Sequence, residues 1–154
     1  MSIIKETIRS VSLGAIPGRI ATYLELVQSA EPLFNLNGKG LEQLCKEHSQ
    51  NLMYYDLMLQ ECKMIEDTVR MKLEELEAEI YKQLNEKGSR VLGATDIRYY
   101  MKGDPRYVAA MEILLEVVHA KKQLESVVEA LKQLGWGLAN IVKLRIAQLE
   151  DTVI

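Results

Sequence analysis

The feature that most constrains the fold is a heptad pattern that runs unbroken from Leu41 to Ile80. Its positions alternate four and three residues apart, and ten of the twelve are apolar or tyrosine: Leu41, Cys45, His48, Leu52, Tyr55, Leu59, Cys62, Glu66, Val69, Leu73, Leu76 and Ile80. Such a seam predicts one helix from about Leu41 to Glu86, roughly 70 Å long at 1.5 Å per residue. A helix of this length needs another long helix or another subunit to pack against.

A second long helix is expected from Pro105 to about Glu150. Asp104 is a suitable N-cap, and proline is tolerated in a first helical turn. The expected apolar seam comprises Val108, Met111, Leu115, Val118, Leu124, Val128, Leu131, Leu138, Val142 and Leu149. Gly135 and Gly137 interrupt this pattern, each at about 1 kcal/mol relative to alanine, so a bend or a close helix approach is expected there. Two long helices joined by a short connection predict an antiparallel hairpin.

Shorter helices are expected around this hairpin. An amphipathic segment from Ser2 to about Ser12 comes first, and a helix opened by Pro17 follows, with Ile20, Tyr23, Leu24 and Val27 on its apolar face. Between the long helices, Thr95 is expected to cap a short helix that ends at Gly103.

These patterns predict an all-α protein, a long coiled-coil-like antiparallel hairpin with two short N-terminal helices, which packs as a coiled coil or assembles with other subunits. Residues 1–37 are expected to be a partner-docking or inter-subunit element. Residues 38–154 would form the hairpin, with an elbow at 87–104.

Composition narrows the class of protein. A chain of 154 residues with 48% apolar content suits one packed domain. No long uncharged apolar run and no signal-like leader is present, so a cytoplasmic protein is expected. Cys45 and Cys62 would lie about 25 Å apart on one helix, too far for a disulfide, and are expected to be reduced.

The connection between the long helices concentrates positive charge. From Lys82 to Arg106 there are six basic and three acidic residues, or +3, while the whole chain has 19 basic and 22 acidic residues, or −3. Everything outside this basic stretch therefore sums to −6. Four of the seven tyrosines fall in or beside it: Tyr81, Tyr99, Tyr100 and Tyr107. Interleaved cations and rings are typical of single-stranded nucleic-acid binding. The alternative is a solvated turn whose tyrosines pack on the hairpin.

Catalytic and metal-binding patterns are weak. The chain shows no nucleophile motif, no phosphate-binding glycine loop and no cluster of Cys and His, so we expect neither an enzyme nor a cofactor nor a metal. Glu116 and His119 have the Glu-x-x-His spacing of dimetal bundles, but an ordinary helix surface is the better interpretation. His48, on the first seam, is interpreted as a polar core residue rather than a catalyst.

From about Leu41 onward, the order of several short segments resembles the UvsY family, the recombination mediators of tailed phages. The segments that carry this resemblance are Asn51–Tyr55, Ile80–Leu84, Asp96–Asp104, Leu124–Leu131, Gly135–Ile141 and Leu144–Arg145. The resemblance covers the chain from about Leu41 to Ile154. The family's strand-binding motif, of Leu-Lys-Ala-Arg-Leu character, aligns with Ile80–Leu84, where Lys82 is the basic residue.

The resemblance implies a homo-oligomeric ring, of roughly six to eight subunits as closed symmetry allows, that binds single-stranded DNA. It also implies partnership with a RecA-type recombinase and with the single-strand-binding protein that the recombinase displaces. The expected DNA-binding residues are Lys82, Lys87, Arg90, Arg98, Tyr99, Tyr100, Lys102 and Arg106. The alternative function is that of a coiled-coil structural, assembly or chaperone protein that does not bind DNA.

Overall fold

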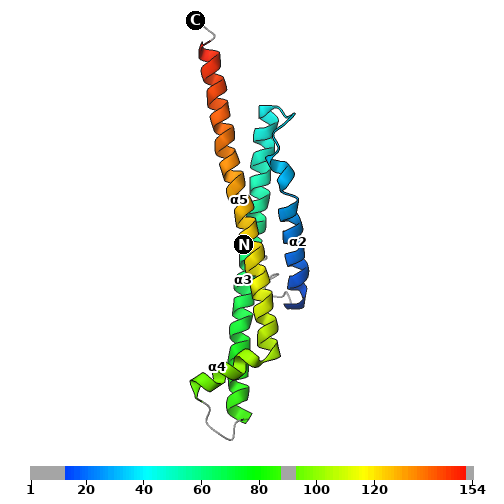
Figure 1. Ribbon diagram of the computed structural model, residues 1–154, viewed down its shortest axis with the longest axis vertical. Helices are drawn as coiled ribbons and strands as arrows, with labels where there is room; N and C mark the ends of the chain where they lie inside the picture. Colours follow the sequence, from blue (N-terminus) through cyan, green and yellow to red (C-terminus); the bar gives the residue numbers. More distant parts are fainter. Residues whose placement is uncertain (1–12, 88–92, 152–154) are drawn as a thin grey trace, which may run out of the picture. The chain divides into compact units, whose positions relative to one another are not determined.

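The computed structural model describes residues 13–87 and 93–151, which form α-helices and short 3-10 helices and include no strand. The all-α class is therefore confirmed. The elements are η1 (Leu13–Ala15), α2 (Ile16–Gln28), η2 (Glu31–Phe34), α3 (Leu41–Lys87), α4 (Ala94–Gly103) and α5 (Pro105–Asp151) (Figure 1). The segment expected from Ser2 to Ser12 lies outside the described residues.

The two long helices begin and end within a residue of their expected bounds. At the start of α5, the backbone N–H of Arg106 donates to Oδ1 of Asp104 at 2.9 Å, which is the expected N-cap. The expected cap of α4 at Thr95 is wrong. Gly93 is the N-cap, because its carbonyl oxygen already accepts from the backbone N–H of Ile97 at 3.1 Å, and Thr95 lies inside the helix.

The chain divides into two compact units, and each long helix contributes to both. Unit 1 comprises residues 1–21 and 62–120, and unit 2 comprises residues 22–61 and 121–154. The expectation that residues 1–37 serve as a docking or inter-subunit element, apart from the hairpin of residues 38–154, stays a prediction.

In unit 1, α3 and α5 run antiparallel. The Cys62 thiol lies 3.8 Å from the carbonyl oxygen of Val117, and Nη1 of Arg106 lies 3.3 Å from Oε1 of Glu79. Residue numbers thus rise along one helix as they fall along the other. Helix α4 crosses the last turns of α3 beside the start of α5 (Figure 1), and its Ile97 is buried.

The seam of α3 is confirmed, because every one of its twelve positions is buried or half-buried. The charged member, Glu66, is buried. Its Oε1 accepts hydrogen bonds from Nε and Nη2 of Arg70 at 3.1 and 2.7 Å. A buried carboxylate without such donors would be costly.

The expected seam of α5 is wrong over its first turns. Val108 and Leu115 are 42% and 64% exposed. The buried residues of α5 are Ala110, Leu114, Val117, Ala120, Leu124, Val127, Val128, Leu131 and Leu138. Helix α5 carries two apolar stripes at heptad spacing, and the one with the small residues Ala110 and Ala120 is buried. From Leu124 to Leu138 the expected positions are correct.

In unit 2, the expected close helix approach occurs at Gly135. A Cβ atom on Gly135 would lie only 2.5 Å from Nε2 of His48, so a larger residue would displace that ring. Within the described part of the chain, the buried Nδ1 of His48 has no hydrogen-bond partner. The Tyr55 hydroxyl donates to the carbonyl oxygen of Leu26 at 2.9 Å, which joins α3 to α2.

Cys45 and Cys62 are both free thiols. Within the described ranges, every helix is too short or too polar to cross a bilayer.

Candidate nucleic-acid interface

The basic and aromatic residues of α4 are held outward by two apolar anchors. Ile97 and Met101, one helical turn apart, are buried and half-buried in unit 1. Arg98 and Lys102 have the same i, i+4 spacing and follow the anchors by one residue. They therefore lie together on the face of α4 next to the one that carries Ile97 and Met101. Both are exposed.

The two tyrosines of α4 are exposed to an unusual degree for aromatic rings. Tyr99 is 79% exposed and Tyr100 is 56% exposed, and their ring centroids lie 6.1 Å apart in an edge-to-face arrangement. The interpretation of the elbow as a turn whose tyrosines pack on the hairpin does not fit this pair. Their rings are open to solvent, where an unstacked base could reach them.

Arg98 and Lys102 have no ion pair and no side-chain hydrogen bond in the part of the chain that the structure describes. We call the four exposed residues Arg98, Tyr99, Tyr100 and Lys102 the α4 surface. Unpaired cations beside open rings are what a phosphate-linked chain of bases requires, since phosphates attract the cations and bases stack on the rings.

Arg106, in contrast, is engaged within the protein. Its guanidinium donates to Asp104, to Glu79 at 3.3 Å and to the side-chain oxygen of Gln83 at 3.0 Å. The hydrogen bonds from Arg106 lower the pKa of Asp104, and the same bonds raise the pKa of Arg106. This arginine ties α5 to α3, and a phosphate would have to compete with three acceptors for it.

The remaining expected site residues lie at the end of α3 or beyond it. Lys82 is exposed and lies 3.8 Å from Glu86 in an i, i+4 pair of the kind that contributes little. Lys87 is the last residue of α3, but its side chain lies outside the description, as does all of Arg90. Of the eight expected residues, the structure thus brings four together on α4.

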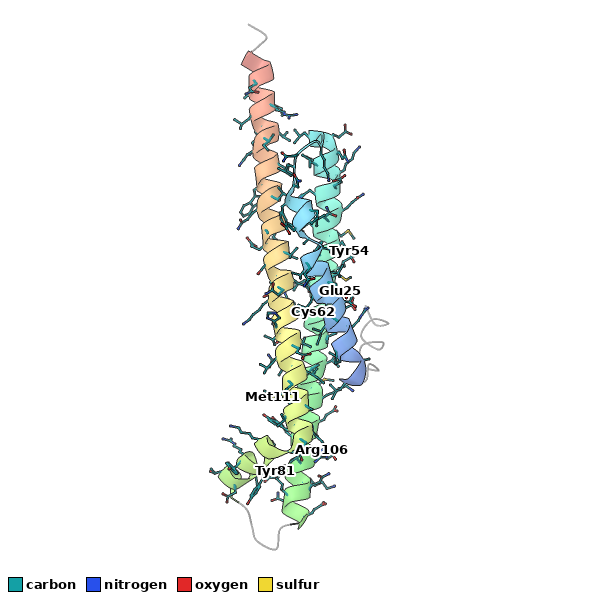
Figure 2. All side chains as sticks on the ribbon, turned by 45° about the vertical axis from the view of Figure 1, so that its right-hand side comes forward. Glu25, Tyr54, Cys62, Tyr81, Arg106 and Met111 are labelled. Carbon is teal, nitrogen blue, oxygen red and sulfur yellow. The ribbon has the colours of Figure 1, made fainter. Side chains whose placement is uncertain are left out.

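Beside the α4 surface is a cleft of about 390 Å³, which the sequence did not predict. We call it the α4 cleft, and it is lined by Glu77, Tyr81, Ala94, Ile97, Arg98, Met101, Lys102 and Tyr107. Figure 2 shows Tyr81 at the end of α3 next to α4. Tyr81 and Tyr107 were conspicuous in the sequence, but nothing there connected them with Glu77, which precedes the basic stretch.

The weaker candidates are not assembled into sites. Glu116 and His119 are both exposed on α5. No cluster of three or more Cys, His, Asp or Glu side chains placed to hold a metal occurs among the residues described. His48 lies against Gly135 in a packed helix contact.

Comparison with known proteins adds no relative. No family model matches the chain, and no curated protein or solved structure matches it either.

Proposed function

We propose that this protein is a recombination mediator that binds single-stranded DNA and assists loading of a RecA-type recombinase while single-strand-binding protein is displaced. The observation that carries the DNA-binding part is the α4 surface, where Arg98 and Lys102, which form no ion pair among the described residues, lie beside two open tyrosine rings. The resemblance to the UvsY family supplies the mediator role and its partners.

The chemistry of this surface favours single strands over duplexes. Unstacked bases expose flat faces to rings such as Tyr99 and Tyr100, whereas the faces of paired bases are covered by their neighbours in the stack. Because every base has a flat face, stacking on the rings of the α4 surface should tolerate any sequence. Because cations neutralise phosphates, binding should weaken as salt rises.

Assembly into an oligomer would compensate for the small positive charge that a single chain offers to DNA. The chain as a whole is −3, and its basic stretch is only +3. In a homo-oligomeric ring, copies of that stretch would act on one strand together, so that many weak contacts become a strong one. We therefore propose a ring as the active form.

A second candidate function rests on the exposed apolar stripe of α5. Val108 and Leu115 are exposed at heptad spacing, with half-buried Met111 and Val118 between and after them. Such a stripe fits another helix. A structural, assembly or chaperone protein would use it to hold protein partners and would not bind DNA.

The test is fluorescence anisotropy of a labelled oligo(dT) strand, titrated with the full chain at low and moderate salt. The mediator proposal expects binding that weakens with salt. Reversing two charges, Arg98→Glu with Lys102→Glu, should lower the affinity by more than about tenfold, since each lost phosphate contact becomes a repulsion.

The matched control reverses two exposed lysines of α5 in unit 2, Lys132→Glu with Lys143→Glu. It changes the net charge equally and should lower the affinity far less. Equal losses in the two variants would contradict a local site on α4. Absence of salt-dependent binding by the wild type would favour the structural candidate.

A further inference from the structure

Three charged side chains line the α4 cleft without forming an ion pair with one another. Glu77 lines it together with Arg98 and Lys102, yet no ion pair joins the carboxylate to either cation. Glu77 is half-buried and has no hydrogen-bond partner within the described residues. A carboxylate that is partly removed from water and left without donors gains from a ligand that brings N–H groups.

The other walls suit a flat ring. Ile97 and Met101 supply an apolar floor from α4, and Tyr81 and Tyr107 contribute aromatic side chains from α3 and α5. The volume, about 390 Å³, lies in the range of roughly 300–1,000 Å³ typical of small-molecule sites. Apolar and aromatic walls with a few polar groups are the usual surroundings of a bound base.

Two basic side chains of the cleft are placed to bind the phosphate of a nucleotide whose base enters it. Arg98 and Lys102 belong both to the cleft and to the α4 surface. A nucleotide whose base enters the cleft would therefore keep its phosphate near the two residues that the proposed function assigns to the DNA backbone.

We propose that the α4 cleft takes one unstacked base of the bound strand, with Glu77 accepting a hydrogen bond from an exocyclic amino group. This inference rests on the proposed function and adds a base preference to it. Cytosine, adenine and guanine carry such an amino group. Thymine and uracil lack it, and their one ring donor, N3–H, lies between two carbonyl oxygens that a carboxylate repels.

Cytosine and uracil make the sharpest pair of probes. They have nearly the same size and shape, but N4 of cytosine is a donor where O4 of uracil is an acceptor, and N3 is an acceptor in cytosine but a donor in uracil. Oligo(dC) should therefore bind about fivefold more tightly than oligo(dU) of equal length, the ratio that one net hydrogen bond gives. Anisotropy at neutral pH, with both strands labelled identically, measures this ratio.

The variant Glu77→Gln should remove the preference, because an amide side chain can either donate or accept. The control is Glu75→Gln, an exposed glutamate of α3 that does not line the cleft. It makes the same change in charge and should keep the preference for oligo(dC).

Each outcome decides the matter. Equal affinity of the wild type for the two strands overturns the cleft proposal but leaves the mediator proposal standing. A preference that survives Glu77→Gln also overturns it, since the amino group would then be recognised elsewhere. Absence of binding to either strand overturns both proposals.

Discussion

Arg98 and Arg106 are eight residues apart in the same basic stretch, yet they have opposite surroundings. Arg98 is exposed on α4 without an ion-pair partner in the described chain. Arg106 is held at the start of α5 by Asp104, Glu79 and Gln83. Counting charges along a sequence gives both the same weight, but only an arginine without internal acceptors is ready to bind a phosphate.

The largest expected effect concerns the rings of the α4 surface. Replacing Tyr99 and Tyr100 together with leucine should weaken single-stranded DNA binding by about 1–3 kcal/mol for each base that stacks on them. Stability should change little, because both rings are exposed. Anisotropy and thermal unfolding measure the two effects, and Tyr54→Leu, which alters a ring 47% exposed on α3, is the control.

A smaller expected effect on DNA affinity distinguishes Arg98 from Arg106. Arg98→Ala should lower DNA affinity several-fold and reduce the slope of log affinity against log salt by about 0.7, the value for one phosphate of a single strand. Its Tm should not change. Arg106→Ala should do the reverse, lowering Tm while leaving the salt slope as in the wild type. The same slope change in both variants would remove the distinction.

A substitution of Asp104 tests whether the contacts of Arg106 stabilise the fold rather than bind DNA. Asp104→Ala removes the N-cap of α5 and one partner of Arg106, so Tm should fall by a few degrees. DNA affinity should not fall, and a freed Arg106 could only raise it. Loss of binding without loss of stability would place Asp104 in the DNA site instead.

The smallest expected effect is on the pH dependence of stability. Because the pKa of Asp104 is lowered in the folded state, its ionised form contributes stability that is present above its unfolded pKa of about 3.9. That contribution is lost as pH falls through the lower, folded value. Denaturant melts at pH 6 and below about pH 4 should show a smaller acid loss in Asp104→Asn than in the wild type.

The fold was largely predictable from the sequence where a helix carries a single long apolar stripe. The α3 seam is unbroken and contains no competing stripe of equal length, so its buried face could be read from spacing alone. On α5, Val108 and Leu115 are as apolar as Leu114 and Val117. The choice between them depends on which face of α5 packs in unit 1, where Ala110 is buried, and no spacing rule reveals that face.

The candidate site was predictable in its composition but not in its geometry. The sequence identified Arg98, Tyr99, Tyr100 and Lys102 because they are concentrated in a short stretch. It could not show that Arg106 is hydrogen-bonded within the protein, since the pairing with Glu79 depends on the register of α3 and α5. For the same reason the α4 cleft, with Glu77 in its wall, could be found only in three dimensions.

The most direct test of a DNA site on α4 is photocrosslinking. The full chain would be irradiated with a single strand that carries 5-iododeoxyuridine at several positions, and the crosslinked residues would be identified by mass spectrometry. The account predicts crosslinks at Tyr99 and Tyr100. Crosslinks confined to Trp136, which is 70% exposed on α5, would contradict it.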